Sequence, residues 1–139
     1  MRQFVHHPAI RRRGPRPPYT RPHIMIDKPA RVLFFLALAF TLFMMLQPHP
    51  PRLVFEALGD KAEHAISFGG MALLARFGFR RAPDWLILER LSFLGAMIEV
   101  IQAIPSLHRD CDWHDWLADT IGVMVSLGII RLFRPLKKA

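Results

Sequence analysis

The chain has 139 residues, of which 52% are hydrophobic, and its 19 lysines and arginines outnumber its 11 aspartates and glutamates. A soluble domain of this length exposes a large share of its area, so it could not hide that much apolar surface. The single cysteine, Cys111, excludes an intramolecular disulfide framework. The composition therefore indicates a small, basic integral membrane protein.

Residues 1–29 differ from the rest of the chain. Seven basic residues alternate with prolines there, and no apolar period is present. Proline removes backbone donors and biases its predecessor away from the helix. We predict a disordered basic arm that rests on anionic lipid headgroups, where each basic residue contributes about 1 kcal/mol. Nucleic-acid binding is the alternative for such an arm, but the adjoining apolar run favours the membrane surface, and no nucleic-acid partner is expected.

Four hydrophobic stretches follow, at about residues 30–47, 64–79, 85–104 and 116–133. A cleaved signal peptide is disfavoured for the first because the basic region before it is too long. Taken alone, the second and third could be amphipathic helices of a soluble bundle. Short connections, tryptophans at the starts of the last two stretches and recurrent small residues favour membrane spans. The sequence thus predicts an all-α, four-helix membrane bundle over residues 30–134, followed by a short tail at 135–139.

The distribution of charge predicts the orientation of this bundle. Four spans place both termini on the same side of the membrane. Fifteen basic residues fall on that side against three on the other, with Arg90 left out because it lies within the third stretch. Basic residues are enriched in cytoplasmic loops. We therefore expect a multi-pass protein of the bacterial cytoplasmic membrane with both termini in the cytoplasm and with acidic outer loops.

Polar residues within and beside the spans are predicted to gather at the outer surface. Two carboxylates near hydrocarbon, Glu99 and Asp119, are costly unless cations pair with them. Lys61 and Arg109 are the available cations, and His64 is a third when protonated. The predicted outer cluster consists of Asp60, Lys61, His64, Glu99, Gln102, Arg109, Asp115 and Asp119.

Three interpretations of this cluster stay open. It is a structural network that ties helix ends together, a binding site for a polar or charged headgroup, or an acid–base site in which Glu99 or Asp119 acts beside His64. No nucleophile flanked by a base stands out, so no catalytic residue is assigned.

Two further predictions concern the helix ends. Residues 107–115 contain histidine, aspartate and cysteine, but their spacing matches no defined zinc signature, so neither a metal nor another cofactor is predicted.

At the cytoplasmic end, Glu89 lies about one turn inside the third stretch, and Arg76 is its expected partner.

The motifs occur in a definite order: Asp60-Lys61-x-x-His64, Glu99-x-x-Gln102, Pro105, Arg109 and Asp115-x-x-x-Asp119-x-x-Gly122. Over about residues 58–128 this combination resembles the VanZ-like family, small membrane proteins named after a teicoplanin-resistance protein. The resemblance implies a four-helix membrane domain with its motif residues on the outer side and no agreed catalytic mechanism. It implies a site made of Lys61, His64, Glu99, Gln102, Arg109 and Asp115. Asp119 departs from the family, in which asparagine is typical.

These observations favour a non-enzymatic binding protein whose outer face recognises an envelope lipid headgroup, a cell-wall precursor or a glycopeptide. Its basic residues suit phosphate or carboxylate groups, and its carboxylates suit amines or hydroxyls. The alternatives are a membrane hydrolase or transferase acting on a lipid-linked substrate, and an assembly factor whose arm recruits a partner.

Overall fold

A computed structural model describes residues 27–48, 59–108 and 111–133. These residues form helices α1 (Asp27–Leu46), α2 (Asp60–Gly78), α3 (Asp84–Gln102) and α4 (Trp113–Leu132), with a 3-10 turn, η2 (Pro105–Leu107), before α4. The described part of the chain contains no strand. The all-α prediction is therefore confirmed for these residues, and one helix occupies each of the four hydrophobic stretches.

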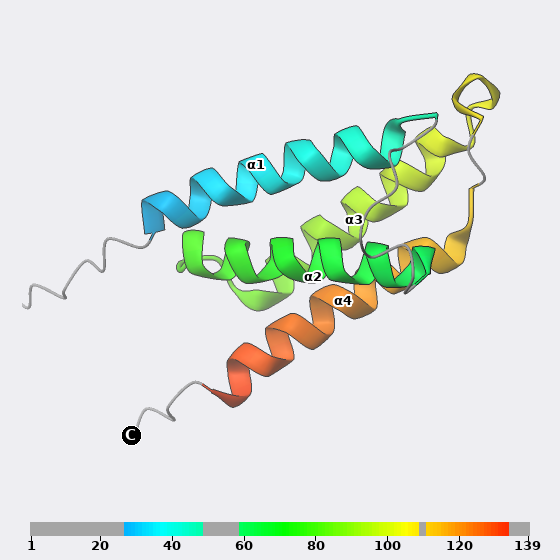
Figure 1. Cartoon of the computed structure of the whole chain (residues 1–139). Coiled ribbons are helices and arrows are strands. Elements are labelled where there is room, and N and C mark those ends of the chain that lie inside the picture. Colours follow the sequence, from blue (N-terminus) through cyan, green and yellow to red (C-terminus); the bar gives the residue numbers. More distant parts are fainter. Residues whose placement is uncertain (1–26, 49–58, 109–110, 134–139) are drawn as a thin grey trace, which may run out of the picture.

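The helices alternate in direction, so the bundle has two chemically different ends (Figure 1). α2 packs against both α1 and α4, and α3 packs mainly against α4. We call the end where α2 and α4 begin the carboxylate end, because it holds Asp60, Glu63, Glu99, Asp112, Asp115 and Asp119. We call the opposite end the arginine end, because it holds Arg31, Arg76, Arg80, Arg81 and Arg131.

Helix α1 begins earlier than predicted. The sequence predicts residues 27–29 as the end of the disordered arm, but they form the first turn of α1. Pro29 is compatible with this position because the first backbone N–H groups of a helix have no partner within it, and Asp27 interacts favourably with the helix dipole. Residues 1–26 of the predicted arm and the predicted tail at 135–139 lie outside the described residues.

Small residues allow α4 to lie close against α2 and α3. A Cβ atom at Gly122 of α4 would overlap the backbone carbonyl of Ala65 in α2. A Cβ atom at Gly95 of α3 would lie 2.6 Å from Asp119 Oδ2. A Cβ atom at Gly70 of α2, by contrast, would meet nothing within 4 Å. Close backbone approach therefore fixes how α2, α3 and α4 are rotated relative to one another.

The outer surfaces of the four helices are rich in large apolar side chains, whereas several charged side chains are buried. The apolar residues that are more than half exposed include Phe35, Phe40, Phe43, Phe93, Val100, Met124 and Val125. The buried core combines Phe68, Met71, Ile98 and Val123 with polar side chains such as His64, Glu99 and Asp119. Among the described helices, α1 alone is long and apolar enough to cross a membrane by itself.

Ion pairs organise the arginine end. Asp84 Oδ1 lies 2.9 Å from Arg76 Nε and its Oδ2 lies 2.8 Å from Arg131 Nε, so one carboxylate joins α2, α3 and α4. Arg80 Nε lies 2.7 Å from Asp27 Oδ1 of α1. The predicted pairing of Arg76 with Glu89 is wrong. Asp84 stands in the first turn of α3, beside the end of α2, whereas Glu89 is exposed.

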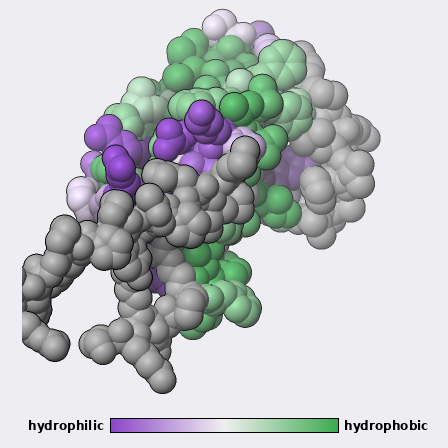
Figure 2. Space-filling view, turned by 90° about the vertical axis from the view of Figure 1, so that its left-hand side faces the viewer, coloured by the Kyte–Doolittle hydropathy of each residue, from purple (hydrophilic) through white to green (hydrophobic). Residues whose placement is uncertain are grey.

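The arginine end also carries a pocket of about 450 Å³ between α2 and α4. Its walls are mainly apolar, and Arg76 and Arg80 contribute its charged groups. Figure 2, which looks onto this end, shows hydrophilic residues beside hydrophobic surface. This pocket is remote from the predicted outer cluster, which lies at the other end of the helices.

Candidate functional site

Lys61 joins the first turn of α2 to the start of α4. Its Nζ lies 2.7 Å from Asp112 Oδ2 and 3.0 Å from Asp115 Oδ1. The Lys61 side chain is half exposed, whereas Asp115 is buried. These hydrogen bonds, the one to Asp112 above all, raise the pKa of Lys61 above its ordinary value. Lys61 therefore stays charged and donates hydrogen bonds to two carboxylates.

Asp112 connects three helices and was not part of the predicted cluster. Its side chain caps α4 by accepting a hydrogen bond from the backbone N–H of His114 at 3.0 Å. Its own backbone N–H donates to Glu99 Oε2 of α3, also at 3.0 Å. The hydrogen bond from Lys61, followed by those from His114, lowers the pKa of Asp112. An aspartate directly before the helical sequence is a common N-cap, and this signal could have identified Asp112 from the sequence.

A buried pair, His64 and Asp119, lies deeper in the bundle. His64 Nδ1 is 3.0 Å from Asp119 Oδ1, and their side chains are 3% and 0% exposed. Asp119 fits here because Gly95 has no side chain. The second oxygen of Asp119 and Oε1 of Glu99 are buried without a hydrogen-bond partner among the described residues. Such acceptors are costly unless a donor or a cation reaches them.

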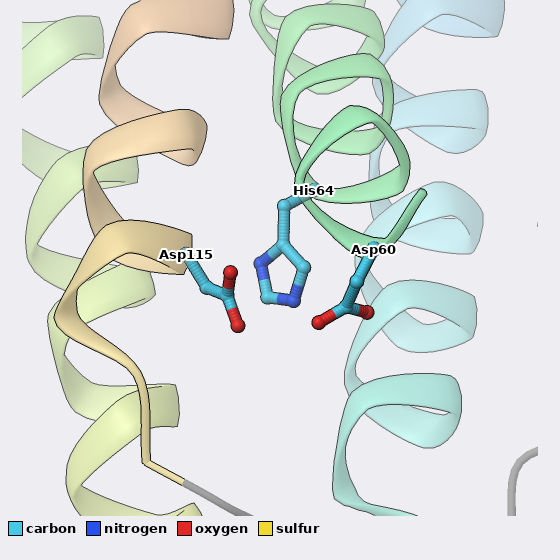
Figure 3. Close-up of side chains that lie close together, drawn as sticks. All are labelled: Asp60, His64 and Asp115. Carbon is cyan, nitrogen blue, oxygen red and sulfur yellow. The ribbon is translucent and has the colours of Figure 1, made fainter. Parts of the chain in front are cut away.

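Asp60, His64 and Asp115 converge above this pair. Asp60 and His64 are four residues apart on α2, and Asp115 comes from the first turn of α4. One possible ligand atom from each lies within 4.8 Å of the other two. Figure 3 shows the three side chains pointing toward one another. Asp60 is exposed at the rim, whereas His64 and Asp115 are buried.

The predicted residues thus divide into three groups. Those that the structure brings together are Asp60, Lys61, His64, Glu99, Asp115 and Asp119. Gln102 is buried at the same end, but its Nε2 donates to the backbone carbonyl of Met45 at 2.7 Å and so ties α3 to the end of α1. Arg109 lies outside the described residues.

The charge balance of the carboxylate end limits what the site can do. Six carboxylates face a single lysine among its described residues, with His64 and His114 as the neighbouring imidazoles. Ionised carboxylates only accept hydrogen bonds. The arrangement therefore suits a ligand that supplies donors or positive charge.

The comparisons with known proteins give no assignment. Protein-family models, curated proteins and solved structures all yield no match to this chain.

Proposed function

We propose that the chain is a VanZ-like, multi-pass protein of the bacterial cytoplasmic membrane that binds a polar envelope headgroup at its carboxylate end. The headgroup belongs to a lipid, a lipid-linked cell-wall precursor or a glycopeptide. The observation that carries the proposal is the buried, carboxylate-rich cluster at one end of helices whose outer surfaces are apolar. The motif residues on which the VanZ-like resemblance rests contribute most of this cluster.

The membrane part of the proposal is supported by the inverted polarity of the bundle. Large apolar side chains lie on the outside of all four helices, while charged groups are buried between them. In water this distribution would be unfavourable, because exposed apolar area costs about 25 cal/mol per Å². In lipid this distribution is favourable, because the apolar side chains contact hydrocarbon and the charged groups face the interior of the bundle. The basic residues of the arginine end support a cytoplasmic location for that end.

The single cysteine provides a direct test of this topology. Cys111 is exposed at the carboxylate end, so a membrane-impermeant thiol reagent should label it in intact cells. A matched variant, Cys111→Ser with Arg81→Cys, moves the only thiol to the exposed turn at the arginine end. The thiol at position 81 should react only after the membrane is permeabilised. Equal labelling of both proteins in intact cells would contradict the proposed orientation.

Donor-bearing headgroups fit the site best. Glu99 Oε1 and Asp119 Oδ2 lack donors among the described residues, and Lys61 is already held by two carboxylates. An ammonium or hydroxyl group would supply what these acceptors lack. A charge-assisted hydrogen bond contributes about 1.5–3 kcal/mol, which corresponds to roughly tenfold or more in affinity.

This binding can be measured by native mass spectrometry of the purified protein in EDTA with defined lipids. An ammonium group supplies positive charge as well as donors, so we expect phosphatidylethanolamine to be retained in preference to phosphatidylglycerol. We expect Glu99→Gln to reduce that retention about tenfold. Glu89→Gln is the matched control, because Glu89 is an exposed carboxylate nearer the other end of the same helix. Unchanged retention in a folded Glu99→Gln protein would contradict headgroup binding at this cluster.

The His64–Asp119 pair favours a second candidate, acid–base chemistry on a lipid-linked substrate. A carboxylate that orients one imidazole nitrogen leaves the other nitrogen to exchange a proton. Turnover of labelled lipid-linked phosphates that is lost in His64→Gln would favour this candidate over binding alone. Absence of turnover in the wild-type protein with any divalent metal would count against it.

A further inference from the structure

His64 is oriented as metal-ligating histidines are. Its Nδ1 is held 3.0 Å from Asp119 Oδ1, and its side chain is 3% exposed. A proton shared on that side leaves a lone pair on Nε2, which has no hydrogen-bond partner among the described residues. In Figure 3 this nitrogen faces Asp60, and the carboxylate of Asp115 lies on the other side of the ring. Histidine ligands commonly donate their other nitrogen to a carboxylate, which fixes the ring and its tautomer.

Two carboxylates lie on either side of the His64 ring. Asp60 shares a face of α2 with His64, because residues four apart are neighbours on a helix. Asp115 approaches from α4, and the possible ligand atoms of all three residues lie within 4.8 Å of one another. Metal–ligand distances are about 2.0–2.2 Å. Small side-chain rotations would therefore bring the three groups onto one ion.

The surrounding charge also favours a cation. Lys61 contacts Asp115 through Oδ1 only, at 3.0 Å, which leaves the second oxygen of Asp115 for another partner. The buried carboxylate of Asp119 lies directly behind the His64 ring. Lys61 is the only lysine or arginine among the described residues of the carboxylate end, and it does not balance these acids.

We propose that Asp60, His64 Nε2 and Asp115 form a binding site for a divalent transition-metal ion, with Asp119 positioning His64. One imidazole and two carboxylates suit Mn²⁺, Co²⁺ or Zn²⁺. Mg²⁺, in contrast, prefers sites made of oxygen ligands only. Three protein ligands leave further coordination positions open for water or for a bound ligand. This site goes beyond headgroup binding and does not depend on it.

The test uses Co²⁺ titrated into the full chain with Cys111→Ser, in detergent without added lipid, and follows the visible absorption of the bound ion. We expect one site, and we expect His64→Gln and Asp60→Asn each to weaken it at least tenfold. His108→Gln and Glu89→Gln are controls that should bind as the parent protein does, since neither residue belongs to the cluster of Asp60, His64 and Asp115. Variants are needed because the chain contains seven histidines.

The variant Asp119→Asn tests whether Asp119 positions the His64 ring for metal binding or only supports the fold. It should weaken Co²⁺ binding about 10–100-fold, as loss of such an orienting carboxylate does, and also shift the absorption band of the ion that still binds. Asp60 is exposed, so Asp60→Asn tests the site even if His64→Gln does not fold. Equal Co²⁺ affinity in the parent and Asp60→Asn proteins, or no bound Co²⁺ in the parent, would overturn the proposal.

The metal proposal and the headgroup proposal are tested by separate measurements, so either can be contradicted without the other. Co²⁺ binding is measured without added lipid, and lipid retention is measured in EDTA. Loss of either property therefore leaves the other measurement intact.

Discussion

The two ends of the bundle contain similar kinds of charged residues but combine them differently. At the arginine end, the carboxylates of Asp27 and Asp84 each contact an arginine, and Asp84 contacts two. At the carboxylate end, one lysine serves two aspartates, and oxygens of Glu99 and Asp119 are buried without donors among the described residues. The two aspartates of the arginine end thus lie in ion pairs with arginines, whereas the described residues of the carboxylate end are short of positive charge.

This difference supports the carboxylate end as the proposed binding site. Paired charges that join three helices have a sufficient structural reason to be there. Buried acceptors without donors lower stability, so their presence is best explained by something that binds them. The ion pairs of the arginine end thus serve as an internal reference for measurements on the carboxylate end.

The largest effect is expected at the buried pair of the carboxylate end. His64→Leu leaves Asp119 without its partner, and breaking a buried pair in this way costs about 3–5 kcal/mol. The double variant His64→Leu with Asp119→Leu should recover much of this loss, because it removes the isolated charge. Unfolding free energies from denaturant titration of the helical signal test both statements. A double variant less stable than His64→Leu would contradict them.

At the arginine end, two arginines that share Asp84 should differ in importance. The Arg76 side chain is 8% exposed and the Arg131 side chain is 69% exposed. We expect Arg76→Gln to cost about 1.5–3 kcal/mol and Arg131→Gln to cost at most about 1 kcal/mol. The same unfolding measurement applies. Equal losses would mean that burial does not determine the strength of these pairs.

Gly122→Ala tests whether close packing holds the carboxylate end together. The new methyl group would overlap the backbone of Ala65, and overpacking of this kind costs about 1–3 kcal/mol. Gly128→Ala, on the same helix, is the matched control because nothing lies within 4 Å of the added carbon. Equal stability of the two variants would show that α2 and α4 can separate without loss.

The smallest effect concerns pH and Asp112. Its pKa is lowered in the folded protein by Lys61 and His114. It therefore contributes stability above its ordinary pKa of about 3.9, and this contribution is lost as the pH falls through the lowered folded value. The difference in unfolding free energy between wild type and Asp112→Asn should narrow below about pH 4. A difference that stays constant down to pH 2 would contradict this origin.

Much of the helical architecture was predictable, because hydrophobic stretches and their connections mark helices directly. The grouping of His64, Glu99 and Asp119 followed from alternating helix directions. The pairing of Arg76 with Asp84 and the contact of Gln102 with the Met45 carbonyl did not follow. These contacts depend on the rotation of each helix about its axis, which spacing within one helix does not specify.

The sequence by itself determined four helices and the unequal charge of their two ends, because these depend on local composition and on the order of segments. Tertiary structure alone decided that Asp112 joins three helices and that Asp119 holds the ring of His64. The physical reason is close packing. Gly95 and Gly122 let backbones approach, and that approach selects which polar side chains meet.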